Sequence, residues 1–440
     1  MAATLQRNHA QSSGSTPLTA LTQTGRSDSR IMIWRELYIL CTVRPEPSMC
    51  SETHAMTHHF DIVIVGAGIA GISLASRIAS HRKVLLLEME YASPYHATAR
   101  SAALKDPIYV PNSEVAALAM ASDAMFKEVP DALRPKAAVH LYPERHLDKF
   151  ADALARCHAV GARVEALDRH EIARRYPYLH PTDCEAAICA PEGAASTIEV
   201  HSLYEHYRRR FEMDRGKILH DHRLTAAQWE GGAWTVRANT DTLVRAPVIV
   251  NAAGAWADIV AAKCQVSPLG LLPLKRTVVE TSLEPSALAP QPEGPFIFWE
   301  GDEDLYVDFK RGGRVLISPA DEQISQPCDA SAEIYDVALA LARFEERTRL
   351  NVVQSRGKEW AGLRTFTRDR SPVIGWSTET KGFFWSAAFG GFGIEISLAA
   401  SAIAADMLLE TNTFRSLADA HDIQAEAFSP ARLEPARTGR

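Results

Sequence analysis

The chain has 440 residues, of which 46% are hydrophobic and 23% charged, a composition typical of a soluble globular protein of about two or three domains. Its formal net charge of −7 and pI near 6.2 exclude the basic balance that would attract nucleic acid or anionic lipid. The seven cysteines form no C-x-x-C pair, which predicts reduced thiols in a cytoplasmic protein and neither a disulfide framework nor a metal site.

The first 55 residues differ from the rest of the chain. They are rich in Ser, Thr, Gln and Arg and poor in acids, which predicts disorder with a short helix near 31–42. The apolar stretch 31–43 is too short and too charged for a transmembrane segment, and no signal-peptide cleavage pattern follows it. We interpret 1–55 as an N-terminal extension before a domain that begins at Met56; a transit peptide is the alternative.

A strand–turn–helix pattern then predicts dinucleotide binding. An apolar run at 61–65, typical of a buried parallel strand, leads into Gly66, Gly68 and Gly71 and a helix at 69–79. In this G-x-G-x-x-G spacing the glycines allow a tight turn, the approach of a pyrophosphate, and close packing of helix on strand. The helix N-terminus offers free N–H groups and a partial positive charge to the phosphates.

A second apolar strand at 84–88 supports this prediction. It ends in Glu88, which lies 22 residues after Gly66, where an acid binds a ribose hydroxyl in dinucleotide-binding domains. An ordinary α/β domain with a glycine turn and an exposed glutamate is the alternative.

The following elements are predicted from periodicity. Small β patterns occur at 216–220, 233–238 and 243–245, and a group of alternating strands indicates an antiparallel sheet at 277–281, 296–300, 305–309 and 314–318. Helical patterns occur at 113–126, 147–160, 169–176, 198–213, 330–350 and 396–409.

Two further glycine junctions can line a nucleotide crevice. The stretch 248–258 is an apolar strand that runs into a glycine turn and a helix. A buried strand at 383–387 precedes Gly390, Gly391 and Gly393, and a helix follows. A glycine-rich helix start can bring N–H groups against a ring carbonyl or an anion.

Together these motifs resemble the D-amino acid oxidase (DAO) superfamily of FAD-dependent oxidoreductases. The resemblance covers about residues 57–430, and the segments 95–103 and 268–276 are most similar to bacterial D-arginine dehydrogenase. The four motifs that carry it, in chain order, are the glycine turn at 66–71, V-N-A-A-G-A-W at 250–256, W-A-G-L-R at 360–364 and G-G-F-G-I at 390–394.

The resemblance implies an α/β fold with a discontinuous Rossmann-like FAD-binding domain (57–105, 190–270 and 355–425). It also implies an α+β substrate domain with a mixed or antiparallel sheet (106–189 and 271–354). FAD is expected to be non-covalent, because related sarcosine oxidases attach flavin through a C-terminal cysteine and the last cysteine here is Cys328. The implied FAD contacts are Gly66, Gly68, Ile69, Ala70, Gly71, Glu88, Arg100, Ser101, Ala102, Ala253, Gly254, Trp256, Gly390, Gly391, Phe392, Gly393 and Ile394.

The resemblance also implies a substrate site. Arg364 and Arg276 match arginines that bind the substrate carboxylate, and Tyr306 and Tyr109 match tyrosines of the same pocket. A planar guanidinium forms two parallel charge-assisted hydrogen bonds and so fixes the orientation that hydride transfer needs. The alternatives are a structural ion pair for each arginine and a half-buried core aromatic for each tyrosine.

The implied reaction is oxidative deamination of a D-amino acid, with hydride transfer from Cα to flavin N5 and hydrolysis of the imino acid to a 2-oxo acid and ammonia. D-Arginine dehydrogenases have a histidine where this chain has Leu104, and a glutamate near Ala137 or Ala138. Without that anion a cationic side chain would be buried unpaired, which predicts neutral or apolar substrates unless Glu144 takes the role. Glu395 replaces a neutral amide and is expected to point away from the flavin.

Two other functions are compatible with the same residues. One is oxidation of a secondary amine such as sarcosine, an N-alkyl amino acid or an opine. The other is a non-catalytic flavin-binding subunit of a hetero-oligomer, which the change to Leu104 suggests and the retained Arg276 and Arg364 oppose. No general base is evident in the sequence, and the electron acceptor and oligomeric state do not follow from it.

Overall fold

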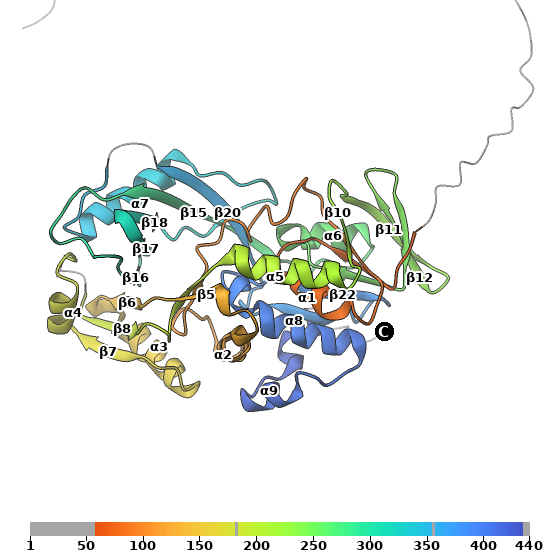
Figure 1. The fold of residues 1–440 in the computed structure, drawn as a ribbon, viewed down its shortest axis with the longest axis horizontal. Helices are drawn as coiled ribbons and strands as arrows, with labels where there is room; N and C mark the ends of the chain where they lie inside the picture. Colours follow the sequence, from red (N-terminus) through yellow and green to blue (C-terminus); the bar gives the residue numbers. More distant parts are fainter. Residues whose placement is uncertain (1–57, 181–183, 354–356, 434–440) are drawn as a thin grey trace, which may run out of the picture. The chain divides into compact units, whose positions relative to one another are not determined.

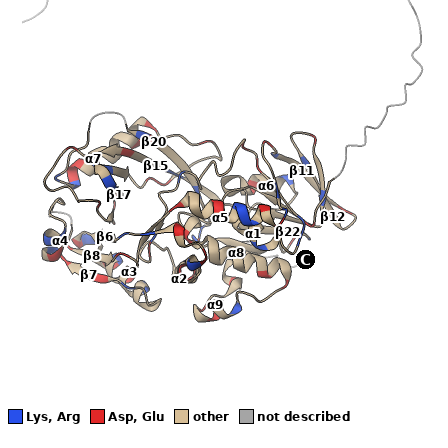
Figure 2. Ribbon diagram, viewed as in Figure 1, with Lys and Arg blue, Asp and Glu red and all other residues tan. Residues whose placement is uncertain are grey.

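The structure is a computed structural model that describes residues 58–180, 184–353 and 357–433 (Figure 1). The predicted extension 1–55 and its short helix lie outside these residues. Within them, no helix is long and apolar enough to cross a membrane. Basic and acidic residues are interspersed along the ribbon (Figure 2), and on α5 (Val200–Met213) they form ion pairs such as Arg208 with Glu205.

A six-stranded sheet contains the predicted glycine turn. Neighbouring strands are parallel, except that the last pair, β22 and β21, is antiparallel. The central strands are apolar runs because both faces of the sheet are covered. In spatial order the strands are β10 (Lys217–Leu219), β3 (Val84–Leu87), β2 (Ile62–Val65), β14 (Val248–Asn251), β22 (Phe383–Ala387) and β21 (Val373–Trp376).

Helices cover one face of this sheet. Ile64 and Leu86 pack there against α1 (Ile69–Ile78), α5 and α8 (Gly393–Leu409), and α2 (Ser113–Met125) lies against α8, where Ala399 N donates to Ser122 Oγ over 3.1 Å. The other face packs on α6 (Ala257–Lys263) and on a four-stranded sheet. That sheet consists of β1 (His58–His59), β13 (Leu243–Ala246), β12 (Ala233–Ala238) and β11 (Leu224–Glu230).

A nine-stranded sheet forms the second layer. Its pairs are antiparallel except β16 with β6, so the sheet is mixed, and the predicted fold class is confirmed. Helices α7 (Ile334–Arg347) and α4 (Arg169–Arg175) cover one face, and α3 (Leu147–Ala159) packs on the other. The strands are β19 (Gln323–Ile324), β15 (Leu272–Ser282), β18 (Arg314–Ser318), β17 (Leu305–Phe309), β16 (Phe296–Trp299), β6 (Ala138–Tyr142), β8 (Ala186–Ala190) and β7 (Glu165–Asp168), with β20 (Lys358–Phe366) paired to β15.

A small three-stranded sheet and a terminal helix complete the described residues. The strands are β4 (Leu104–Lys105), β9 (Ser196–Ile198) and β5 (Leu133–Pro135), and the helix is α9 (Arg415–Ala420). The division into two domains stays a prediction. One segment of it, 355–425, was expected in the FAD-binding domain but contributes β20 to the nine-stranded sheet.

Several predicted elements need correction. Helix α5 begins at Val200 because Ile198 belongs to β9 and pairs with Leu133. Helix α8 begins at Gly393, three residues before the prediction, and α7 is shorter at both ends than 330–350. Strands β6, β7, β8 and β11 were not predicted; β6 and β8 are buried along their whole length and so show no alternation.

Candidate active site

Two positions in the glycine turn between β2 and α1 have no room for a side chain. Gly66 has φ +103°, and a Cβ there would lie 2.5 Å from the Ala252 carbonyl oxygen at the end of β14. A Cβ on Gly71 would lie 1.9 Å from the Gly66 oxygen, because α1 packs directly on the turn. Both positions therefore require glycine.

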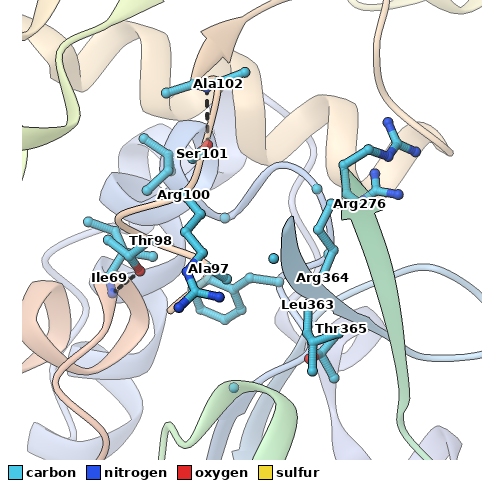
Figure 3. A pocket seen from close by; sticks show the side chains of 18 of the residues that line it. Ile69, Ala97, Thr98, Arg100, Ser101, Ala102, Arg276, Leu363, Arg364 and Thr365 are labelled. Atoms are coloured by element: carbon cyan, nitrogen blue, oxygen red, sulfur yellow. Dashed lines mark hydrogen bonds between the residues drawn. The ribbon is translucent and has the colours of Figure 1, made fainter. Parts of the chain in front are cut away.

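Two side chains accept hydrogen bonds from the backbone of this turn. Glu88, at the end of β3, is 8% exposed, and its Oε2 accepts from Ala67 N over 2.8 Å. Thr98 Oγ1 accepts from Ile69 N, the first residue of α1, over 3.0 Å (Figure 3). Glu88 was predicted from its spacing to Gly66, whereas Thr98 was not singled out, although it lies in the segment 95–103 that contributes to the family resemblance.

The turn opens onto two adjoining cavities. The glycine-turn cavity, about 150 Å³, is lined by residues that include Gly66, Glu88 and Trp256. The arginine cavity, about 200 Å³, is lined by residues that include Arg276 and Arg364. Both cavities share Gly68, Ala97, Thr98, Arg100, Ala252, Gly254 and Leu363, so they form one elongated space.

Most of the residues predicted to bind FAD line this space. Gly71 lies behind it, and Phe392 lines a third cavity. Arg100 lines it, but its guanidinium donates to the carbonyls of Ala330 (2.8 Å) and Ala361 (2.9 Å) and pairs with Asp329, so it fastens the 95–103 loop to β20. The residues that line one or both cavities are Gly66, Gly68, Ile69, Ala70, Glu88, Arg100, Ser101, Ala102, Ala253, Gly254, Trp256, Gly390, Gly391, Gly393 and Ile394.

The two predicted arginines come from neighbouring antiparallel strands. Arg276 on β15 lies opposite Gly362, and Arg364 on β20 lies opposite Leu274, so the arginines are diagonal neighbours on one face of the sheet. Figure 3 shows them across the pocket from the loop that carries Thr98 and Arg100. Burial, and then the nearby Arg276 charge, lower the pKa of Arg364.

Arg364 has an unused donor. Its Nη1 donates to the Tyr109 hydroxyl over 3.0 Å, whereas its buried Nε has no hydrogen-bond partner among the described residues. Two close cations with an unsatisfied N–H can hold an anion, and a carboxylate suits the guanidinium fork. The glycine loop before α8 lies beside them, since a Cβ on Gly391 would be 3.1 Å from Arg364 Nη1.

Aromatic residues form the wall next to the arginines. Tyr306 on β17 is 6% exposed, burial raises its pKa, and its ring centre is 5.7 Å from the Arg276 guanidinium. Phe298 on β16 lies between Tyr306 and Tyr109, with ring centres 5.7 Å and 5.4 Å away. Both predicted tyrosines therefore line the arginine cavity.

The structure also shows where the residues lie on which the predicted substrate preference depends. Leu104 lines the arginine cavity, whereas Ala137, Ala138 and Glu144 line none of the three cavities. Glu395 is buried outside the arginine cavity and accepts a hydrogen bond from Asp106 N over 2.9 Å. Burial raises the pKa of Glu395 well above its ordinary range.

Two residues that the sequence analysis missed lie beside the arginine pair. Glu322, in the loop after β18, accepts from Arg364 Nη2 (3.0 Å) and from Arg370 Nη2 (2.6 Å). Burial raises the pKa of Glu322, but Arg370, Arg364 and Arg276 outweigh this and lower it to about 2. Glu322 and Arg370 line an outer cavity of about 360 Å³, which shares Tyr109, Arg276 and Phe298 with the arginine cavity.

A buried histidine supports the aromatic wall. His140 is 1% exposed, and its Nε2 and Nδ1 lie 2.8 Å from Asp106 and 2.6 Å from Glu300. Burial lowers the pKa of His140, but the Asp106 and Glu300 carboxylates outweigh burial and raise it to about 9. The imidazolium stacks on Phe298, with ring centres 4.3 Å apart.

A Rossmann-like sheet, a glycine turn without room for side chains and a cavity that continues to a pair of arginines are features of a dinucleotide-binding protein. The model of the DAO family, FAD dependent oxidoreductase, matches residues 61–407, and the chain belongs to this family.

Relatives agree with this assignment. The chain is 23% identical to glycine oxidase of Geobacillus kaustophilus (strain HTA426) over 379 residues, which cover 82% of this chain and 96% of that protein. The structure of L-proline dehydrogenase from P. horikoshii has a TM-score of 0.72 at 17% identity and covers 86% of this chain and 98% of its own. That of iminodiacetate oxidase from Chelativorans sp. BNC1 has a TM-score of 0.66 at 18% identity, covering 84% and 98%. These two structures show that the fold is shared.

The cofactor is FAD, and the residues present fit it. Gly66 makes the tight turn after β2, where a Cβ would meet the Ala252 carbonyl oxygen, Gly68 lines both cavities, and Glu88 places a buried carboxylate at the end of β3 beside the turn. The elongated space has the course that a dinucleotide needs, from the glycine turn to the loop before α8.

Proposed function

We propose that the protein oxidises the Cα–N bond of an amino acid, preferably a D-amino acid with a neutral or apolar side chain, and yields a 2-oxo acid and ammonia. The observation that carries the proposal is the pair Arg276 and Arg364, which lies in the cavity that the cofactor-binding glycine loop also lines. Glycine oxidase, to which the chain is similar over most of its length, is named for a reaction on an amino acid.

The residues of the chain bind and orient the substrate. The guanidinium groups of Arg276 and Arg364 hold its carboxylate, and Tyr109 aligns Arg364 by accepting its Nη1 hydrogen. Bound FAD would supply the acceptor for the hydride that leaves Cα. The amine loses one proton, so that with the hydride two electrons and two hydrogens leave the substrate. Water then hydrolyses the imino acid to the 2-oxo acid and ammonia.

The lining of the arginine cavity supports a neutral side chain. Leu104, Val278, Phe296 and Phe298 are apolar, and no Asp or Glu of the described residues lines this cavity. The guanidinium of D-arginine would be buried there without a partner, which is costly. The resemblance to D-arginine dehydrogenase is thus proposed to extend to the carboxylate end of the substrate and not to its side chain.

A second candidate is oxidation of a secondary amine that carries two carboxylates, such as an opine or iminodiacetate. Arg370 favours it, since this third arginine lies beside the pair at the outer cavity and can meet a second carboxylate. Iminodiacetate oxidase is among the proteins that share the fold.

FAD is proposed to be non-covalent, because Cys328 lines the glycine-turn cavity and not the arginine cavity. A cytoplasmic location is proposed from the thiols, since the five cysteines within the described residues form no disulfide.

The test is anaerobic reduction of the purified flavoprotein, followed by the loss of absorbance at about 450 nm. D-Alanine, D-leucine, D-arginine, the L-isomers, N-methylglycine and iminodiacetate are added singly. Bleaching by neutral D-amino acids, with little by D-arginine, is the expected result. Bleaching only by N-substituted substrates establishes the second candidate, and no bleaching by any amine overturns both and leaves a flavin-binding subunit.

A further inference from the structure

A carboxylate of the chain itself, that of Glu322, contacts both arginines of the pair. Glu322 Oε1 accepts from Arg364 Nη2 over 3.0 Å and lies 3.5 Å from Arg276 Nη2. Its Oε1 and Oε2 also accept from Nη1 and Nη2 of Arg370, over 3.2 Å and 2.6 Å. One carboxylate thus contacts three guanidinium groups, and 32% of its side chain is exposed to solvent.

The segment that carries Glu322 is fixed to strand β15. Asp321 accepts hydrogen bonds from Thr277 N (2.7 Å) and from Thr277 Oγ1 (3.1 Å), and its own carbonyl accepts from Arg276 Nε over 3.0 Å. The backbone next to Glu322 is therefore held in place, while the Glu322 side chain has solvent on one side.

Glu322 occupies donors that a substrate carboxylate needs. A carboxylate that binds Arg276 and Arg364 together requires N–H groups that point into the same space, and Glu322 uses Nη2 of both. Among the other donors of the pair, Arg364 Nε is buried and unpartnered in the described part of the chain. The Nε–H offers one hydrogen bond from one arginine, whereas a carboxylate in the place of Glu322 meets Nη2 of both arginines.

We propose that Glu322 is a specificity-determining residue that occupies the arginine pair in the absence of substrate and moves onto Arg370 when a substrate carboxylate binds. Arg370 already makes the two-point contact with Glu322, so the displaced carboxylate keeps a charged partner. Binding is then an exchange of one carboxylate for another. The inference rests on the proposed role of Arg276 and Arg364 in binding the substrate carboxylate.

The exchange has a consequence for selectivity. The three arginines that contact Glu322 carry three positive charges against its one negative charge, so the group is net positive. Without Glu322 on the arginine pair, this group would bind any small anion. A ligand with only a carboxylate must pay the cost of displacing Glu322 with that one group. An amino acid also fills the aromatic part of the arginine cavity beside Phe298 and Tyr306. Glu322 therefore disfavours simple anions relative to complete substrates.

The test measures binding without turnover. Acetate is titrated into the FAD-loaded protein, and its Kd is read from the change in the flavin absorption spectrum and, independently, by calorimetry. We expect Glu322→Gln to bind acetate at least about tenfold more tightly than the wild type. We expect Arg370→Gln to bind it more weakly, because Glu322 then has no second partner. The control Glu293→Gln removes a carboxylate paired to the exposed Arg311 and leaves the Kd unchanged.

The Kd for acetate is expected to fall in Glu322→Gln and to rise in Arg370→Gln. These opposite changes separate the proposal from a purely structural role of Glu322 and Arg370, which would weaken acetate binding in both variants. Unchanged or weaker acetate binding in Glu322→Gln overturns the inference. If that variant loses FAD, Glu322→Asp replaces it, and tighter acetate binding than in the wild type is again required. Failure of the proposed function is distinguishable, since acetate binding can change as expected while no amine reduces the flavin.

Discussion

Arg364 Nη1 donates to the hydroxyl of Tyr109 over 3.0 Å, a contact between residues 255 positions apart in the chain. Tyr109 stacks in turn on Phe298, so the hydroxyl is held in place by the aromatic wall. The direction of the Arg364 guanidinium is therefore set by a residue from a different segment.

Replacing Tyr109 by Phe tests this alignment. The ring and its stacking on Phe298 are retained, but Arg364 loses an acceptor, at a cost of about 1 kcal/mol. We expect a KM roughly fivefold higher with a smaller change in kcat. The exposed Tyr335 supplies the control, since Tyr335→Phe should leave both constants unchanged. An unchanged KM in Tyr109→Phe would contradict the alignment.

Conversion of either arginine of the pair to lysine keeps the charge and removes the planar fork. We expect Arg364→Lys and Arg276→Lys each to lower kcat/KM for the best amino acid roughly 100-fold, with FAD retained, because orientation of the carboxylate is lost. Steady-state kinetics and the flavin spectrum measure this. Arg311→Lys, at an exposed ion pair, is the matched control, and equal activity in all three variants would refute the role of the pair.

Alanine at Gly66 tests the fit of the cofactor turn. Its Cβ would meet the Ala252 carbonyl oxygen at 2.5 Å, so we expect loss of bound FAD and poor folding. Gly232 also has a positive φ (+78°), but a Cβ there has no heavy atom of the described residues within 4 Å. Gly232→Ala should therefore keep a full complement of flavin with only a small loss of stability. Equal FAD content in both variants would be incompatible with the closed turn.

His140 makes stability depend on pH. Its pKa of about 9 lies above the ordinary value of about 6.5, so its contribution is complete below about pH 6.5 and is lost as the pH rises through 9. We expect the free energy of unfolding to fall by about 3 kcal/mol between these pH values, and by clearly less in His140→Gln. Urea unfolding at pH 6.5, 8 and 9.5 measures it. His158→Gln, at an exposed position, should retain the wild-type slope.

The sequence indicated those parts of the molecule in which local pattern and local structure coincide. Gly66, Gly71 and Glu88 lie within one strand–helix–strand unit, so their spacing could be interpreted without the fold. Arg276 and Arg364 followed from a family resemblance, because nothing in the sequence alone indicates that β15 and β20 are neighbours.

The rest of the site depends on contacts that leave no local trace. Glu322 meets Arg364 and Arg370 only because the loop after β18 returns to β15. His140 lies in β6, a strand that was not predicted, and its partners Asp106 and Glu300 come from two other segments. Pairing of distant charged residues has no period and no motif, so these roles could be found only in the folded chain.

The register of β15 with β20 fixes the spacing of Arg276 and Arg364 independently of the strand that carries Leu104. Because Arg276 and Arg364 are diagonal neighbours in one ladder, the spacing of the two cations is a property of the backbone and needs no loop to maintain it. Leu104, which faces the rest of the arginine cavity, belongs to another strand, β4. Libraries that vary position 104 can therefore search for new substrate side chains while the spacing of the two cations is inherited unchanged.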